Sequence, residues 1–446
     1  MTEKNQIADM PNGTSERADH SPTLAEKAEE GTTIAAPPAQ SSNQNRVDGG
    51  LMAWIQVVAG WSIFFNTWGI LNTFGIFQTY YESGALFSET SSNIAWIGSI
   101  QALTLVTVGL VSGPLYDRGY FSALMLVGSF MMVFSFMMLS ICHTFWEALL
   151  AQGFCFGIGA GLVYVPTLAV LPTYFSKKLG LAVGIAASGS SLGGVIYPIV
   201  FYNLINSVGF GWAVRTIGFI MLGTLLLPVC LMRVRIKPAR PRAFLDWSAF
   251  TDWPFAFFTF STMIGFLGLY VVMFFVSYFA EATGVASDKM AFYLVPFLNA
   301  SSVFGRTIPN YISDRTGPFN LFGPAAIICG ILAFCLIAVT SLGGVVAITV
   351  LYGFFSGVYI ALPSVCFVRL TADKTKIGTR IGMGYAFTSL AVLAGGPGGG
   401  GVLGTGVVEL HWNSLWIYGA ITTLTSGVML IALRFWMTKG KILMRI

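Results

Sequence analysis

Long apolar stretches separated by short polar connections cover the chain from about residue 51 to residue 437. A helix needs roughly 20 apolar residues to cross the hydrocarbon core of a bilayer. Twelve segments reach that length, approximately 51–81, 94–116, 120–142, 144–173, 178–206, 211–232, 253–280, 289–312, 318–340, 343–369, 378–406 and 411–437. The pattern predicts an all-α integral membrane protein with twelve transmembrane helices.

Composition supports this interpretation. Hydrophobic residues make up 55% of the 446 residues and charged residues only 10%, whereas soluble domains carry about 25% charged residues. A chain with this balance cannot bury its apolar surface in one soluble core. The net charge of +5 gives no indication of nucleic-acid binding, and we expect none.

The first 47 residues are different in character. They are rich in Ser, Thr, Ala, Pro, Glu and Asn, and such a segment cannot bury enough apolar surface to fold alone. They also lack the basic and apolar regions of a cleaved signal peptide. We expect residues 1–47 to be a disordered cytosolic tail.

The distribution of basic residues predicts the orientation. With the N-terminus in the cytosol, 21 of the 24 Lys and Arg residues fall in cytosolic connections or tails, and the exceptions are Arg215, Lys289 and Arg306. Cytosolic loops of membrane proteins carry such an excess of positive charge. We therefore predict that both termini are cytosolic. The plasma membrane is the expected location, with a vacuolar or other internal membrane as the alternative.

An internal repeat divides the apolar region. Asp117-Arg118 follows the second predicted span and Asp314-Arg315 follows the eighth, 197 residues later. Two six-helix halves related by a repeat are typical of secondary transporters, whose solute site lies between the halves near the middle of the membrane. The predicted organisation is a tail at 1–47, an N-terminal half at 48–232, a basic cytosolic linker at 233–252, a C-terminal half at 253–437 and a cytosolic tail at 438–446.

The Asp-Arg pairs are candidates for conformational gating. The residues are Asp117, Arg118, Asp314 and Arg315. An acidic side chain at the end of a span can pair with a neighbouring helix terminus, and that contact would break when the halves move. The alternative is a pair of solvated turns.

Arg306 is the one formally charged side chain predicted deep inside a span. A charge at that depth costs several kcal/mol or more, so it marks a functional site by default. Asn299 and Ser302 precede it by seven and four residues and share its helix face. We predict that this polar stripe lines a solute-binding cavity. The alternatives are that Arg306 extends towards the headgroups and that Asn299 bonds between helices.

Three further polar residues in spans, Asn72, Tyr164 and Tyr359, are candidates for solute contact, with packing as the alternative for each. The glycine-rich run 395–401 predicts either a bent or broken helix or close packing between helices. Neither a phosphate-binding GxxxxGK[ST] loop nor an HExxH metal motif occurs in the sequence, so we expect an ATP-independent protein without cofactor or metal.

The loops after spans 2 and 8, the twelve spans and the basic linker resemble the major facilitator superfamily over roughly residues 48–437. Three strings resemble the monocarboxylate-porter family, in particular its fungal branch: Asp48-Gly49-Gly50 with Trp54, the run 174–184, and Phe304-Gly305-Arg306. The resemblance implies that Arg306 holds a substrate carboxylate. Ser302 stands where animal members carry an Asp associated with proton coupling, and the first span lacks their Lys.

The predicted function is transport of a small organic anion or carboxylate-bearing metabolite by alternating access, by a chain that acts as a monomer in the lipid bilayer. One alternative is efflux of a fungal secondary metabolite, which the resemblance also implies. A second alternative is a membrane sensor that binds its solute without moving it. An enzyme is not expected.

Overall fold

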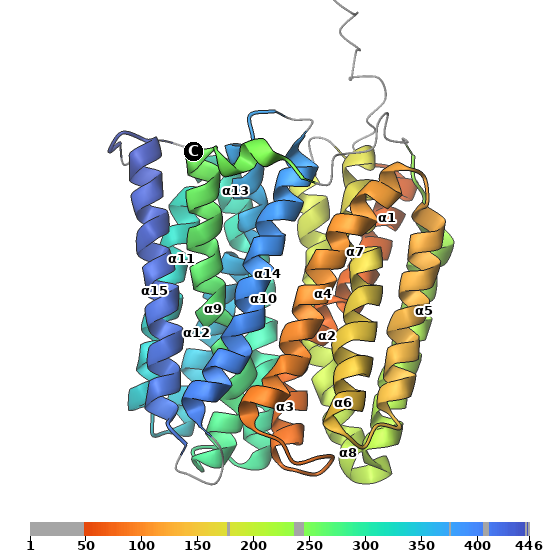
Figure 1. The fold of residues 1–446 in the computed structure, drawn as a ribbon, viewed down its shortest axis with the longest axis vertical. Helices are drawn as coiled ribbons and strands as arrows, with labels where there is room; N and C mark the ends of the chain where they lie inside the picture. The colour runs from red at the N-terminus through yellow and green to blue at the C-terminus, as the bar shows by residue number, and fades with distance from the viewer. Residues whose placement is uncertain are drawn as a thin grey trace, which may run out of the picture. The chain divides into compact units, whose positions relative to one another are not determined.

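The structure is a computed structural model that describes residues 49–175, 179–235, 245–373, 376–404, 410–441 and Met444. The predicted tail at 1–47, together with Asp48, lies outside these residues, as does part of the predicted linker. The regular elements of the described residues are helices only (Figure 1). They are α1 (Leu51–Asn66), α2 (Trp68–Asn72), α3 (Phe74–Glu82), α4 (Ser91–Asp117), α5 (Phe121–Leu139), α6 (Phe145–Ala148), η2 (Leu149–Cys155), α7 (Phe156–Tyr174), α8 (Leu179–Leu231), η3 (Trp247–Phe250), α9 (Trp253–Ala282), α10 (Asp288–Thr316), α11 (Phe319–Cys335), η4 (Leu336–Ala338), α12 (Leu342–Ala361), α13 (Pro363–Leu370), α14 (Ile377–Leu403) and α15 (Trp412–Met437).

The helices of the described residues make twelve traverses. Nine helical stretches among those residues are long and apolar enough to cross a membrane. One of them, α8, is two traverses, because Gly209 breaks it with φ 76° and ψ 172°. A further traverse is built from α1, α2 and α3, and the last is α10, which the polar residues around Arg306 make less apolar. The predicted fold class is confirmed.

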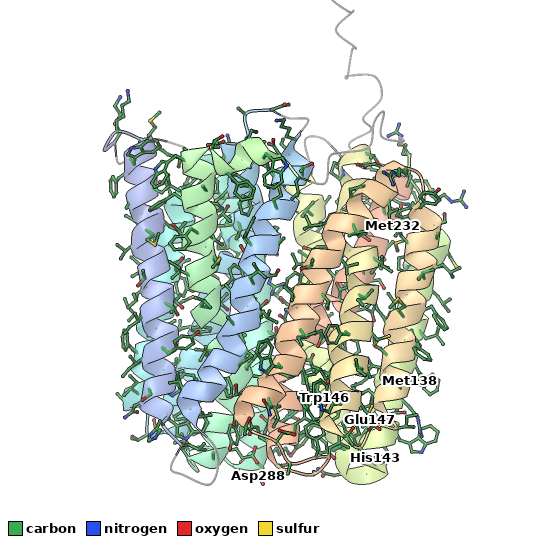
Figure 2. The ribbon with its side chains drawn as sticks, in the orientation of Figure 1. Met138, His143, Trp146, Glu147, Met232 and Asp288 are labelled. Atoms are coloured by element: carbon green, nitrogen blue, oxygen red, sulfur yellow. The ribbon has the colours of Figure 1, made fainter. Side chains whose placement is uncertain are left out.

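The two ends of the bundle carry different connections. α1 begins and α15 ends at the end that also carries linker residues 245–252, which we call the linker end (top in Figure 1). We call the opposite end, where α3 ends and α4 begins, the far end. Figure 2 shows Glu147, His143 and Asp288 at the far end and Met232 near the linker end.

The first traverse is interrupted twice by threonine. The Thr67 hydroxyl donates to the carbonyl of Ile63 at 2.8 Å, and the Thr73 hydroxyl donates to the carbonyl of Gly69 at 2.8 Å. Such side-chain bonds to the preceding turn compete with the helical backbone ladder. α1, α2 and α3 follow one another as short pieces, with Thr67 at φ −84° and ψ −79° between the first two, and Asn72 lies at the second interruption.

The first six traverses meet the last six mainly along three pairs of helices, with a smaller contact between α3 and α10. α4 packs on α14, α8 packs on α10, and α3 packs on α9. At the far end the Ser92 hydroxyl of α4 donates to the carbonyl of Pro397 on α14 at 2.9 Å. We call the contacts of Ser91 and Ser92 with Pro397 and Gly400 the far-end seam. Its formation brings the two halves together where α4 begins.

The glycine-rich run of α14 serves this close packing. α14 is one continuous helix from Ile377 to Leu403 and includes Pro397, so the alternative of a broken helix is wrong. A methyl group added at Gly400 would lie 2.7 Å from the backbone nitrogen of Ser92, and one added at Gly395 would lie 2.4 Å from the Leu267 carbonyl oxygen of α9. Helices that approach this closely need small residues at the contact.

Candidate functional site

Arg306 lies at the contact between α10 and α8 and is only 4% exposed. Its Nε donates to the Ser302 hydroxyl at 3.2 Å, one turn earlier on α10. Its Nη1 donates to the hydroxyl of Ser190 on α8, in the other half of the molecule. Its Nη2 is buried and has no hydrogen-bond partner among the described residues. A guanidinium carries five N–H donors, so this one keeps free donors for a ligand.

Within the part of the chain that the structure describes, no acidic side chain pairs with Arg306. Among the side chains that the structure describes, Arg306 is hydrogen-bonded to two hydroxyls and to no carboxylate. A buried charge without a counter-charge is costly. The arrangement favours a bound oxyanion, which would supply both the missing charge and the missing hydrogen-bond acceptors.

Glycines hold α12 against the face of α10 that carries this stripe. A methyl group at Gly305 would lie 1.9 Å from the Phe354 carbonyl oxygen, and one at Gly357 would lie 2.8 Å from the Ser302 hydroxyl oxygen. α12 therefore packs directly beside Ser302, which is fully buried. With α12 on one side and α8 on the other, the rotational setting of α10 is fixed and Arg306 points to the interface of the halves.

Asn299 and Asn72 meet across the same interface. The Asn299 Nδ2 donates to the Val295 carbonyl at 3.0 Å and makes a long contact of 3.5 Å with the Asn72 carbonyl. Asn299 Oδ1 and both polar atoms of the Asn72 side chain are buried, and the residues that the structure describes give them no hydrogen-bond partner. Buried polar groups are nearly always satisfied in native proteins. These three atoms, like Arg306 Nη2, are therefore available to a solute or to water.

Aromatic side chains border Arg306. The phenol groups of Tyr164 on α7 and Tyr270 on α9 lie close enough to interact with Arg306 electrostatically. Tyr164 is half-buried, and its ring packs edge-to-face against Trp68 with centroids 5.7 Å apart. The Tyr270 hydroxyl is buried and makes no hydrogen bond to any residue in the described ranges. Tyr270 and Trp68 were not predicted as site residues; their positions near the middle of apolar spans are the signal that could have found them.

Tyr359 is held inside the last six traverses. Its hydroxyl donates to the Thr262 carbonyl at 3.2 Å and shares a 2.8 Å hydrogen bond with the Ser426 hydroxyl. Its ring packs on Phe322 with centroids 4.6 Å apart. The fully satisfied hydroxyl agrees with the packing alternative, and the structure does not group Tyr359 with the residues around Arg306.

The predicted gating residues lie at the linker end. Asp117 ends α4 and is only 9% exposed, and Arg118 follows as the C-terminal cap of the helix. The Arg315 guanidinium donates to the Tyr311 hydroxyl at 2.9 Å and lies over the ring of that residue. The side chain of Asp314 lies outside the described part of the chain. The gating role of the four residues stays a prediction.

An ion-pair cluster that the sequence did not reveal joins the linker to α14. Asp246 accepts hydrogen bonds from Lys376 at 3.0 Å and from Arg380 at 2.9 Å, and Arg380 also pairs with Asp252. Burial opposes ionisation of Asp246, but the hydrogen bonds from Ser248, Arg380 and Lys376 outweigh it and hold its pKa well below the usual range. The cluster fixes the end of the linker to the first turn of α14.

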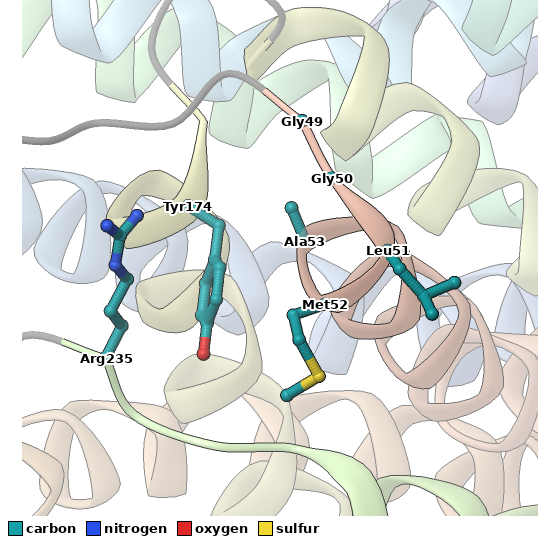
Figure 3. A pocket seen from close by; sticks show the side chains of 7 residues that line it. All are labelled: Gly49, Gly50, Leu51, Met52, Ala53, Tyr174 and Arg235. Carbon is teal, nitrogen blue, oxygen red and sulfur yellow. The ribbon is translucent and has the colours of Figure 1, made fainter.

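A shallow hollow of about 350 Å³ opens beside the start of α1 (Figure 3). It is lined by Gly49, Gly50, Leu51, Met52, Ala53, Tyr174 and Arg235. It lies within the first six traverses at the linker end, away from Arg306. Within the described residues, no group of three or more His, Cys, Asp or Glu side chains could hold a metal ion.

Comparison with known proteins connects this architecture to transporters. The profile of the Major Facilitator Superfamily matches residues 52–372. The MFS-type transporter dbaD of Emericella nidulans is 55% identical over 398 residues, which are 89% of this chain and 89% of that protein. The aspyridones efflux protein apdF of the same organism is 38% identical over 372 residues, 83% of this chain and 76% of that protein. The agnestins efflux protein of Paecilomyces divaricatus is 36% identical over 392 residues, 87% of this chain and 88% of that protein.

Solved structures share the fold at low sequence identity. The crystal structure of a variant of the nucleoside transporter NupG has a TM-score of 0.64 and 14% identity, and the match covers 85% of this chain and 99% of that chain. A POT family transporter in complex with 5-aminolevulinic acid has a TM-score of 0.68 and 13% identity, with 87% and 96% covered. The family profile, the relatives and the helical architecture agree: this chain is a multi-pass membrane protein that belongs to the major facilitator superfamily.

Proposed function

We propose that this protein exports an anionic secondary metabolite by alternating access, and that Arg306 anchors the anionic group of the solute. The observation that carries the proposal is the buried guanidinium between α8 and α10, which has an unpartnered nitrogen and no described carboxylate partner. The relatives named as efflux proteins of aspyridones and agnestins support export over uptake.

The groups around Arg306 define the solute class. A planar guanidinium binds a carboxylate, or another oxyanion whose charge is shared by two oxygens, through two parallel hydrogen bonds. Asn72, Asn299 and Tyr270 add unpartnered donors and acceptors, and Tyr164 adds an aromatic face. This mixture fits a metabolite with one acidic group, further oxygen substituents and a flat ring, which is larger than a short-chain monocarboxylate.

Alternating access is proposed because the solute residues come from both halves. Arg306 and Asn299 lie on α10, and Asn72 and Ser190 lie on traverses of the other half. A solute held between them contacts both halves and can favour their rearrangement by binding one arrangement more tightly than the other. The far-end seam would open in that rearrangement, and the Asp-Arg pairs at the linker end would exchange partners.

The proposal also includes the branch of the superfamily, the orientation in the membrane, the membrane itself and the functional unit. Arg306 and the string that begins at Asp48 support the monocarboxylate-porter branch of the superfamily. The charge distribution supports a cytosolic linker end with both termini inside and, as a setting for export, the plasma membrane. We propose that one chain is the functional unit, because the solute residues all come from the two halves of a single chain.

Uptake of a small carboxylate is the second candidate function. A lone arginine without a carboxylate partner would also suit a small organic acid moving inwards. The direction of net movement separates the two candidates. A sensor that binds without transport would show neither direction of flux.

The test is metabolite export from a fungal host that lacks its own copy. Strains would carry wild type, Arg306→Ala, Arg306→Lys or, as a matched control, Arg369→Ala, which removes an exposed arginine at the linker end. Mass spectrometry would give the ratio of each acidic metabolite in the medium to that in the cells. We expect a fall of about tenfold or more for both Arg306 variants, since each 1.4 kcal/mol of lost binding is tenfold, and no change for Arg369→Ala.

Two results would overturn the proposal in different ways. Equal export by wild type and both Arg306 variants, at matched protein levels, would remove Arg306 as the anchor. The second result is that the ratio of metabolite in the medium to that in the cells is the same with and without the protein, while acids enter cells faster when the protein is present. The function would then be uptake and not export.

A further inference from the structure

Glu82 is a half-buried carboxylate at the far end of the bundle that the sequence analysis did not single out. It is the last residue of α3, where the first traverse ends. α3 is the part of this traverse that packs on α9 of the other half. Glu82 therefore lies where the two halves close against each other at the far end.

Neutral groups hold the Glu82 carboxylate. Its Oε1 accepts a hydrogen bond from the Gln78 amide at 2.7 Å, and its Oε2 accepts one from the Ser91 hydroxyl at 2.9 Å. Gln78 is fully buried. Within the described residues no Lys or Arg pairs with Glu82, and its polar contacts there are the bonds from Gln78 and Ser91. A carboxylate charge in this setting costs more free energy than in water, because burial removes hydration and no cation replaces it.

The titratable groups that face Glu82 do not lower this cost. Tyr278 on α9 lies close enough to interact with Glu82 electrostatically, and Tyr278 also faces Glu281 on the same helix. Glu281 in turn faces Asp288 at the start of α10. The titratable groups that interact with Glu82, and with Glu281 beside it, are thus neutral or acidic, while the cations Lys289 and Arg215 lie elsewhere at the far end. Bringing α9 towards α3 brings Glu281 towards Glu82.

Glu82 is linked to the far-end seam through Ser91. Ser91 bonds to Glu82 and begins α4, and a methyl group added at Gly400 on α14 would lie 2.8 Å from the Ser91 backbone carbonyl carbon. The next residue, Ser92, donates to the Pro397 carbonyl. Opening the seam would separate Ser91 from Gly400, and the accompanying movement of α9 away from α3 would take Tyr278 from Glu82 and admit water to its carboxylate.

We propose that Glu82 is a proton-binding site that controls the far-end gate, so that a proton from the solution at the far end binds Glu82 as the seam closes and leaves as it opens. The inference rests on the proposed alternating-access function, in which this seam is a gate. Protonation removes the buried charge and favours closure; ionisation favours the open, hydrated arrangement. If the far end faces outwards, acid outside the cell would speed the return of the empty transporter and oppose rebinding of the exported anion.

The test measures the gate without any solute. The full chain, with its six cysteines replaced, would carry nitroxides at Ser207→Cys and Thr340→Cys, two exposed far-end positions in different halves. Pulsed electron–electron resonance in lipid nanodiscs from pH 8 to pH 5 would report their distance distribution. For one coupled proton we expect the ratio of the short to the long population to rise with acid by at most tenfold for each pH unit.

Two variants decide the assignment. Glu82→Gln keeps the shape and removes the charge, so we expect the short population to dominate at every pH. Glu89→Gln is the matched control, because Glu89 is an exposed carboxylate of the same loop that bonds only to Asn93 among the described side chains; it should respond to pH like the parent. A parent without a pH response, or a Glu82→Gln variant that keeps the parent's response, would overturn the proposal. Failure of the export test would leave this result standing, since no solute is present.

Discussion

The Arg306 guanidinium on α10 and the Ser190 hydroxyl on α8 are hydrogen-bonded to each other across the interface between the two halves. The bond joins residues that are 116 positions apart in the chain. A solute oxyanion that accepts hydrogen bonds from both Nη1 and Nη2 of Arg306 would compete with Ser190 for Nη1. Solute binding and separation of the halves near Arg306 are thus expected to favour each other.

Replacing Ser190 by Ala tests this relationship. The change leaves a second nitrogen of a buried guanidinium without an acceptor, and we expect a loss of about 1–3 kcal/mol of stability. In an Arg306→Met background the same change should cost almost nothing, because both partners are then apolar. Thermal unfolding of the four proteins in detergent measures the coupling. Equal losses in both backgrounds would show that the bond does not stabilise the fold.

Gly400→Ala is expected to weaken the far-end seam. The added methyl group would lie 2.7 Å from the Ser92 backbone nitrogen, and overpacking of this kind costs about 1–3 kcal/mol. Gly401→Ala is the matched control, since a methyl group there meets nothing within 4 Å. The pair of far-end nitroxides should report a larger open population for Gly400→Ala only. A similar shift in both variants would mean that helix propensity, not the seam, is responsible.

Tyr359→Phe and Tyr270→Phe should behave in opposite ways. The Tyr359 hydroxyl is bonded to Thr262 and Ser426, so its loss should lower stability by about 1 kcal/mol and leave export unchanged. The Tyr270 hydroxyl is buried and has no partner in the described part of the chain, so its loss should leave stability unchanged or raised and weaken export. Thermal unfolding and the ratio of metabolite in the medium to that in the cells together distinguish packing from solute contact. If Tyr359→Phe reduced export and Tyr270→Phe did not, Tyr359 and not Tyr270 would be the residue that contacts the solute.

Asp246→Asn should make stability less dependent on pH. Asp246 has a lowered pKa in the folded protein, so its contribution is complete above the unfolded value of about 3.9 and declines as the pH falls below it. At pH 7 we expect the variant to be less stable by about 1–3 kcal/mol, because charge-assisted bonds from Arg380 and Lys376 are lost. The difference in the free energy of unfolding between the variant and wild type should become smaller below about pH 4. Thermal unfolding across this range is the measurement, and a difference that widens with acid would contradict the assignment.

The sequence predicted the traverses closely and the contacts between them only in part. Apolar length and basic residues locate a span because both depend on the bilayer, and the predicted 253–280 and 411–437 lie within a few residues of α9 and α15. The helix face shared by Asn299, Ser302 and Arg306 follows from helical periodicity alone. Ser190 could not be predicted as the partner of Arg306, since periodicity does not say which face of α8 meets α10.

The predictions from the sequence that were ambiguous or wrong, and the residue that they missed, have related causes. The glycine-rich run of α14 was open to two interpretations, because small residues serve both bending and close packing, and only the nearness of α4 and α9 decides between them. Tyr359 was grouped with the site since a polar group in a span is the same signal whether its partner is a solute or Ser426. Glu82 was missed because a carboxylate at the end of a span is ordinary until the opposite half is seen to cover it.

The far-end seam also has an electrical consequence. Backbone of α14 stands so close to backbone of α4 that a single methyl group at Gly400 would overlap it, and a water molecule is about as large as that group. A file of water molecules, along which protons could hop, has no room at this point. The closed seam therefore prevents protons from hopping along water between α4 and α14 at this contact. Each copy of the protein thus has one fewer route by which protons could leak and dissipate the ion gradients across the membrane that holds it.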